Sequence, residues 1–192
     1  ECNAMEYMFS SEEDSKWQFD ADLEKKVLID PAQEGANELR IISAYASPSM
    51  VAWHIQALAD LNIQPVQIKL IVGMCPFDGL SMVANCGFKK LVETEFGPEY
   101  SSFNCQYVYK SPAVHSKLYL WMKNGKPYKA FSGSANYTLK GFSKDCDEFI
   151  TECNLDEAFA YYKKVEGKTI YCTANEVENY IRIYRISPNY SY

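Results

Sequence analysis

The chain has 192 residues, of which 47% are hydrophobic and 15% aromatic, so it can form one domain with a buried core. Its net charge is −6, which argues against strong binding of a polyanion by the molecule as a whole. It contains no run of about 18 apolar residues and no basic flank leading into an apolar stretch, so we expect neither a membrane span nor a signal peptide.

Residues 1–16 are polar and acidic, and we expect them to be a flexible N-terminal segment or a tag remnant before one domain at 17–192. The seven cysteines contain no Cys-x-x-Cys pair, and only two histidines are present. This pattern predicts reduced, mostly buried thiols in a cytoplasmic protein, with no metal site.

The first predicted elements alternate between strand and helix. Glu38–Ser47 and Val66–Met74 are apolar runs typical of buried strands. Between these two strands, Ser47 and Pro48 supply the start of a helix. After the second strand, the loop Cys75–Gly79 leads into a helix that runs to about Phe96. This order indicates βαβ units with parallel strands.

The middle of the chain contains three more predicted strands, at Phe103–Lys110, Lys117–Lys123 and Tyr128–Ser132. Asn124-Gly125 separates the last two and is a strong signal for a hairpin turn. A further strand is expected at Asp147–Cys153.

The last part of the chain predicts two helices. Asn154 and Glu157 have the spacing of a capping box, and Thr173 and Glu176 repeat it before a helix expected to reach Tyr184. The whole pattern predicts a single α/β domain with a mixed, largely parallel central sheet flanked by helices on both faces.

Two short motifs carry groups suited to phosphate chemistry. His115 and Lys117 are two residues apart at the start of a strand, so both side chains project to one face. Gly133-Ser134-Ala135-Asn136 closes the next strand, and the hairpin should return it to the first motif. An imidazole, an ammonium, a hydroxyl and an amide would then surround one point.

The lysines are unevenly distributed. Seven of them and no acidic residue lie between Lys110 and Lys144, so this segment carries +7 and the remainder −13. A local positive field can hold phosphate, and Lys110, Lys140 and Lys144 are candidate substrate-binding residues. On charge alone, a solvated lysine-rich hairpin is the better interpretation.

Several candidates also have a purely structural interpretation. A histidine such as His115 is more often structural when taken alone, but Lys117 and the Gly-Ser-x-Asn run favour catalysis. His54 follows Trp53 in an amphipathic helix and is expected to be structural. We expect the aromatic set to pack a sheet rather than stack on bases; it comprises Tyr107, Tyr109, Tyr119 and Trp121.

The motif pair resembles the phospholipase D superfamily, whose signature is His-x-Lys followed by Gly-Ser-x-Asn and then an acidic residue. More of the chain is similar to the NgoFVII restriction endonuclease branch, over roughly Leu28 to Tyr180. Much of the superfamily has Asp five residues after the motif lysine, where this chain has Met122. The segments that fit the branch are Glu38–Ser43, Leu70–Met74, Val114–Tyr119 and Gly133–Thr138.

The resemblance implies a phospholipase D-like fold and a homodimer with one active site at the two-fold interface. One His115 would attack phosphorus to give a phosphohistidine, and the other would protonate the leaving oxygen, without metal or cofactor. Lys117, Asn136 and Ser134 would hold phosphoryl oxygens. Glu148 would orient His115, with Asp145 and Asp147 as alternatives.

The function implied is DNA cleavage by the nuclease domain of a restriction endonuclease, with DNA recognition left to a separate domain or subunit. Alternatives are a hydrolase of RNA, single strands or phospholipid with the same fold, and a non-catalytic dimerisation or binding module. The sequence contains no basic amphipathic helix, which makes a membrane partner the weakest alternative.

Overall fold

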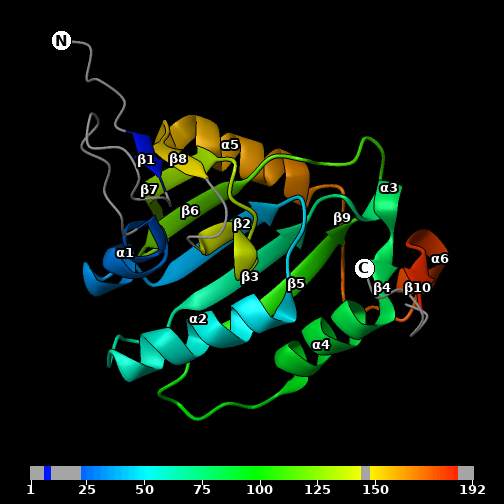
Figure 1. The fold of residues 1–192 in the computed structure, drawn as a ribbon, viewed down its shortest axis with the longest axis horizontal. Coiled ribbons are helices and arrows are strands. Elements are labelled where there is room, and N and C mark those ends of the chain that lie inside the picture. The colour runs from blue at the N-terminus through cyan, green and yellow to red at the C-terminus, as the bar shows by residue number, and fades with distance from the viewer. Residues whose placement is uncertain (1–6, 10–22, 144–147, 186–192) are drawn as a thin grey trace.

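The computed structural model describes residues 7–9, 23–143 and 148–185. An eight-stranded sheet has the order β1-β8-β7-β6-β2-β3-β5-β9, and a two-stranded sheet pairs β10 with β4 (Figure 1). The strands are β1 (Tyr7–Phe9), β2 (Glu38–Ser43), β3 (Gln67–Val72), β4 (Leu80–Ser81), β5 (Ser102–Val108), β6 (Leu118–Lys123), β7 (Lys126–Gly133), β8 (Phe149–Glu152), β9 (Thr169–Tyr171) and β10 (Ile183–Tyr184). The helices are α1 (Asp30–Gln33), α2 (Pro48–Asp60), α3 (Cys75–Asp78), α4 (Met82–Glu93), α5 (Leu155–Glu166) and α6 (Val177–Tyr180), with a π-helical turn η1 (Lys25–Ile29) and a 3-10 turn η2 (Lys140–Phe142).

The predicted βαβ units form the parallel centre of the sheet. β2 pairs with β3 and β3 with β5, both in parallel, and the crossovers run through α2 and through α3 and α4. Ser47 caps α2 as expected, since its Oγ accepts a hydrogen bond from the backbone N–H of Met50 at 3.3 Å.

The prediction of a largely parallel sheet is wrong, although the mixed α/β fold with helices on both faces is confirmed. β6 pairs antiparallel with β2, β7 with β6, β8 with β7, and β9 with β5. Asn124 and Gly125 both have positive φ, 51° and 78°, which gives the tight turn expected from sequence. No helix lies between β5 and β6 or between β6 and β7, so these strands have no crossover to make them parallel.

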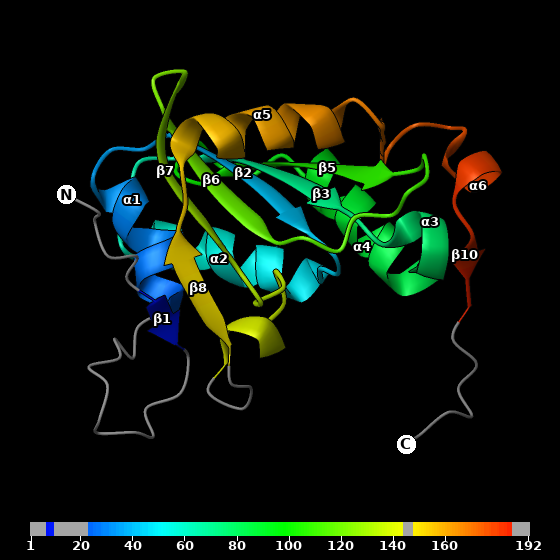
Figure 2. The same ribbon diagram turned by 90° about the horizontal axis from the view of Figure 1, so that it is seen from above.

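The sheet separates two apolar cores. Figure 2 shows α5 on one face and α2 with α4 on the other. Side chains alternate between these faces along β2: Leu39 and Ile41 are buried in the core under α2 and α4, whereas Ile42 belongs to the core under α5. Met122, which stands where much of the superfamily has Asp, is also buried in the α5 core. It therefore packs the fold and does not take part in the site.

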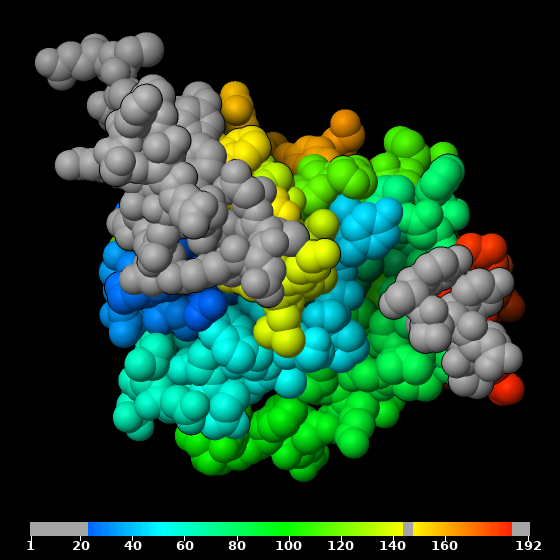
Figure 3. Space-filling model, viewed as in Figure 1, coloured from blue at the N-terminus to red at the C-terminus, as the bar shows by residue number. Residues whose placement is uncertain are grey.

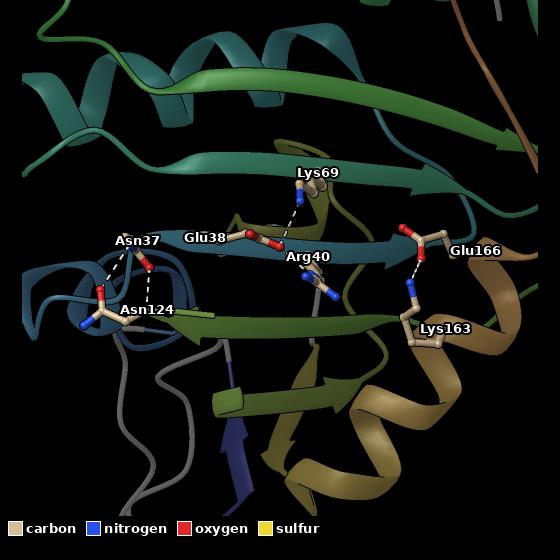
Figure 4. Close-up of polar contacts among 7 residues, drawn as sticks. All are labelled: Asn37, Glu38, Arg40, Lys69, Asn124, Lys163 and Glu166. Carbon is tan, nitrogen blue, oxygen red and sulfur yellow. Dashed lines mark hydrogen bonds and ion pairs between the residues drawn. The ribbon is translucent and has the colours of Figure 1, made fainter. Parts of the chain in front are cut away.

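Charged groups on the α5 face of β2 are paired with one another. Glu38 contacts Arg40 on its own strand and Lys69 on β3, the latter at 3.1 Å (Figure 4). The Arg40 guanidinium also lies 5.5 Å from the ring centres of Phe159 and Tyr162 on α5. These half-buried charges thus help to seat α5 on the sheet.

The two ends of the described chain differ from expectation. Within residues 1–16, Tyr7–Phe9 forms β1 and pairs with β8, while the rest of that segment lies outside the described residues. The last helix, expected to reach Tyr184, is wrong beyond Tyr180, because Ile183 and Tyr184 pair with β4. Its capping box is also absent: Glu176 is the N-cap and makes no side-chain capping bond. The cap of α5 is confirmed, since Asn154 Oδ1 accepts from the Glu157 N–H at 3.0 Å.

Candidate active site

The β6–β7 hairpin brings the two predicted motifs together at one end of the sheet. Leu118 pairs with Ser132, and Ser132 Oγ donates to the Lys117 carbonyl at 2.8 Å. The residues just before β6 and those just after β7 are therefore neighbours. The Ser134 N–H donates to the Phe149 carbonyl at 2.9 Å, and its hydroxyl donates to the Glu148 carboxylate. The His-x-Lys motif, the Gly-Ser-x-Asn motif and Glu148 therefore lie together at the ends of these strands.

Gly133 is required where β7 meets β8. A Cβ atom at this position would lie 2.1 Å from the Phe149 carbonyl oxygen, far inside van der Waals contact. Glycine at this position therefore permits the close approach of the two backbones.

His115 is exposed, whereas Lys117 is buried beside it with 7% of its surface accessible. Lys117 Nζ lies 3.1 Å from His115 Nδ1 and donates to the His115 carbonyl at 2.8 Å. Burial lowers the pKa of Lys117, and the nearby negative charge of Glu148 partly opposes this effect. The arrangement places one buried cation beside Nδ1 of an exposed imidazole.

Asn136 has a defined amide orientation. Its Oδ1 accepts from the Tyr45 N–H at 3.2 Å and lies 3.3 Å from Ser43 Oγ. Because a backbone N–H can only donate, the oxygen must be on this side, and the amide nitrogen points away from it. Among the described residues Nδ2 has no hydrogen-bond partner, so its two N–H groups are available to an anion.

Ser43 and Tyr45 are site residues that the sequence analysis missed. Ser43, at the end of β2 and fully buried, donates to the Tyr45 carbonyl at 2.5 Å and accepts from the Tyr137 N–H at 2.9 Å. The Tyr45 ring stands edge-on to the His115 ring with centroids 6.3 Å apart, and its hydroxyl donates to Asp78 at 2.6 Å. The only sequence signal was position, since Ser43 ends β2 and Tyr45 follows it, and ligands of α/β sheets bind beyond the carboxyl ends of the strands.

Contact between the segments after β2 and β7 is visible on the surface, where the yellow segment lies against the light-blue one (Figure 3). A parallel bridge joins Ala46 to Tyr137, and the Ser47 N–H donates to the Tyr137 carbonyl at 3.2 Å. The loop that carries Asn136 is thereby fixed to the end of β2.

His54 is structural, as predicted. It is fully buried on α2, and its Nε2–H donates to the Leu28 carbonyl at 2.8 Å. Nδ1 therefore accepts from the Tyr137 hydroxyl, also at 2.8 Å. Burial lowers the pKa of His54 to about 4, so the ring is neutral near pH 7. His54 supports the site from behind by holding Tyr137, the neighbour of Asn136.

The aromatic set largely packs the sheet, as expected: Tyr107, Tyr119 and Trp121 are fully buried. Tyr119 also anchors the site, because its hydroxyl donates to the Ala135 carbonyl at 2.8 Å. Tyr109 is half-buried and belongs to a different surface, described below.

The described lysines between Lys110 and Lys140 do not form one cluster. Lys123 and Lys129 contact Glu34 at the turn end of the hairpin, so these two lysines belong to the hairpin and not to a phosphate-binding cluster. Lys140 is exposed in η2, which follows the Asn136 loop, and Lys110 lies 5.2 Å over the Tyr109 ring. Of the predicted site residues, Lys144 lies outside the described part of the chain, as do the alternative carboxylates Asp145 and Asp147.

The carboxylate expected to orient His115 makes a different contact in this structure. Glu148 hydrogen-bonds to Ser134, and among the described residues the group at His115 Nδ1 is the Lys117 ammonium. His115, Lys117, Ser134, Asn136 and Glu148 are nevertheless brought to one place, while Lys110 contributes to another surface.

Other site types find no counterpart in the described residues. No group of three or more His, Cys, Asp or Glu side chains there is placed to hold a metal ion. No described helix is both long and apolar enough to cross a membrane. The five described cysteines are free thiols, and Cys75, Cys105 and Cys172 are buried.

Solved structures with a similar fold include a member of the phospholipase D family. Nuc from Salmonella typhimurium, a phospholipase D family member, aligns with a TM-score of 0.51 and 12% identity, over 95% of this chain and 99% of that one. A polyphosphate kinase from Porphyromonas gingivalis aligns at 0.50 and 11%, over 83% of this chain and 22% of the kinase. NucT from Helicobacter pylori aligns at 0.49 and 13%, over 88% and 99%. A comparison with curated proteins finds no match.

The sheet and the His-x-Lys and Gly-Ser-x-Asn motifs at its edge define a domain of the phospholipase D fold. More specifically, the chain belongs to the NgoFVII restriction endonuclease family, whose N-terminal PLD domain matches residues 21–179. It is thus a phospholipase D-like nuclease domain of the NgoFVII type.

Proposed function

We propose that the chain is a metal-independent phosphodiesterase that cleaves DNA through a phosphohistidine on His115. The observation that carries this proposal is the convergence of exposed His115 with buried Lys117 and with Asn136, whose Oδ1 is turned toward Tyr45. An ammonium and an amide beside an imidazole can hold two oxygens of a phosphodiester while the ring reacts with phosphorus.

The reaction needs two histidines in different protonation states, so we propose that a second copy of the chain completes the site. His115 Nε2 of one copy forms the N–P bond as the P–O bond to the leaving group breaks, and His115 of the other copy gives that oxygen its proton. Water then attacks the phosphohistidine, gives its proton to the second imidazole and releases the first. The exposure of His115 is compatible with access from a partner.

The contact at Nδ1 bears on both roles. An ammonium can only donate, so while Lys117 is charged Nδ1 accepts and the neutral ring carries its proton on Nε2, where it cannot attack phosphorus. The copy that acts as the acid must be the imidazolium, which is protonated on both nitrogens. The attacking copy needs its proton on Nδ1 and an acceptor there. Glu148 is the carboxylate we propose for this role, because its charge already acts on Lys117. Ser134, which donates to Glu148, would position that carboxylate and the oxygens of the substrate.

The restriction role is also proposed from the family. DNA recognition would be supplied by a separate domain or subunit, because the chain has a net charge of −6 and most of its hairpin lysines contact Glu34 or lie away from His115.

The test is cleavage of plasmid DNA in EDTA, followed by quenching in base to trap phosphohistidine, which is stable to alkali. We expect cleavage to persist in EDTA and to be lost in His115→Ala and Lys117→Ala. Lys126→Ala, which removes an exposed lysine at the hairpin turn, is the matched control and should retain activity.

Several results would overturn the proposal. They are a requirement for magnesium, full activity of His115→Ala, or an active species that is strictly monomeric by light scattering. Parallel assays with RNA, single-stranded DNA and phospholipid vesicles separate the DNA assignment from the other substrates of this fold.

A further inference from the structure

Exposed aromatic and cationic side chains form a contact chain that leads away from His115. Tyr45, beside the His115 ring, is 43% exposed and bonds to the Asp78 carboxylate. Arg182 donates from Nη2 to the Asp78 carbonyl at 2.9 Å. Asp78 therefore joins a residue at the candidate active site to one near the end of the described chain.

Arg182 is held there by backbone contacts. The Leu80 N–H donates to the Arg182 carbonyl at 2.9 Å, and β10 continues the pairing with β4. Gly79 has a φ of 73°, and a Cβ there would meet the Arg182 carbonyl oxygen at 2.5 Å. This segment is thus fixed to the fold rather than loosely attached.

Two aromatic–cation pairs lie along this segment. The Arg182 guanidinium is 5.7 Å from the ring centre of Tyr184, which is 41% exposed. Tyr180, at the end of α6, is 54% exposed and lies 5.0 Å from the Tyr109 ring, over which Lys110 is placed at 5.2 Å. Figure 1 shows α6, β10, β4 and α3 together at one side of the molecule.

Exposed tyrosine rings with cations beside them can bind nucleotides. Bases stack on aromatic rings regardless of sequence, while Arg and Lys contact the phosphates between them. Tyr107, Tyr119 and Trp121 of the central sheet cannot do this, because they are fully buried. The acidic members are limited in effect: the Asp78 carboxylate is occupied by the Tyr45 hydroxyl, although Glu178 on α6 is exposed.

We propose that Tyr45, Arg182 and Tyr184, extended by Tyr180 and Lys110, bind unpaired nucleotides on one side of the scissile phosphate. The occupant is a single-stranded stretch of nucleic acid, since stacking requires bases released from a duplex. This assignment rests on the proposed function for the direction of the strand, which would leave the site past Tyr45. The surface would hold one strand where the DNA substrate is locally opened, a contact that the His-x-Lys motif does not provide.

The test measures binding separately from cleavage. A fluorescent single-stranded oligonucleotide is titrated with the full chain carrying His115→Ala, and anisotropy gives the Kd. Adding Tyr184→Ala or Arg182→Ala should weaken binding about tenfold, while Tyr184→Phe should retain most of it. Tyr171→Ala, which removes a tyrosine that is 52% exposed on β9, is the matched control and should leave the Kd unchanged.

A duplex of the same sequence shows whether unpaired bases are recognised. We expect a smaller effect of Tyr184→Ala on the duplex than on the single strand. Equal weakening of both, no effect of either substitution, an equal loss in Tyr171→Ala, or no binding by the parent chain would each overturn this inference. Thermal unfolding of every variant checks that the fold is retained.

Hydrolysis of bis(p-nitrophenyl) phosphate separates this inference from the proposed function. That small diester reaches only the reacting groups, so Tyr184→Ala should hydrolyse it at the rate of the unsubstituted chain. Absence of hydrolysis by the unsubstituted chain would count against the proposed function and leave the binding result intact.

Discussion

Acidification is expected to destabilise the protein through His54, and the size of the effect follows from its surroundings. The ring is fully buried between the Leu28 carbonyl and the Tyr137 hydroxyl, and its pKa falls from 6.5 to about 4. Between pH 6.5 and about 4, His54 binds a proton in the unfolded chain but stays neutral in the folded chain. Stability is therefore complete above pH 6.5 and falls as the pH drops toward 4.

These two pKa values give an unfolding equilibrium that is about 30-fold less favourable to the folded state at pH 5 than at pH 7.5, or about 2 kcal/mol. The free energy of unfolding is measured with urea at both pH values for the parent, His54→Gln and His115→Ala. The parent and the exposed-histidine control should lose about 2 kcal/mol, whereas His54→Gln starts less stable and should lose little.

The pH range isolates histidine from carboxylates. Glu34 and Glu38 have pKa values lowered by their hydrogen bonds to lysine, tyrosine or arginine, so their contributions decline only below pH 4.5. An equal acid-side loss in His54→Gln would refute the argument, because the chain has only two histidines and the other is exposed.

Two further substitutions probe the support of the site. Ser43→Ala leaves the buried Tyr137 N–H without its acceptor, which should cost about 1–3 kcal/mol of stability in urea unfolding and lower kcat more than it changes KM; unchanged kcat would exclude a positioning role. Gly73→Ala would place a Cβ 2.0 Å from the Val114 carbonyl oxygen and displace the segment that carries His115, so nuclease activity should fall steeply. If a crystal structure of that variant left His115 in place, the explanation would be wrong.

Local sequence determined most of the secondary structure and the two motifs of the site. Asn124-Gly125 specified the hairpin because residues tolerant of positive φ make such a turn, and the hairpin brought the start of β6 beside the end of β7, where the two motifs lie. His54 could be assigned as structural because it lay in an amphipathic helix, which buries one face.

Tertiary structure alone decided the strand directions at the edges of the sheet and the residues that surround the motifs. The short apolar run at Thr169–Tyr171 became a strand only because β5 offered an open edge, and Ile183–Tyr184 became a strand because β4 did the same. Ser43 contacts Asn136 across 93 positions, and Arg182 contacts Asp78 across 104. Such contacts leave no periodic trace in the sequence, because they depend on which strand ends meet after the chain has folded and not on the residues beside each partner.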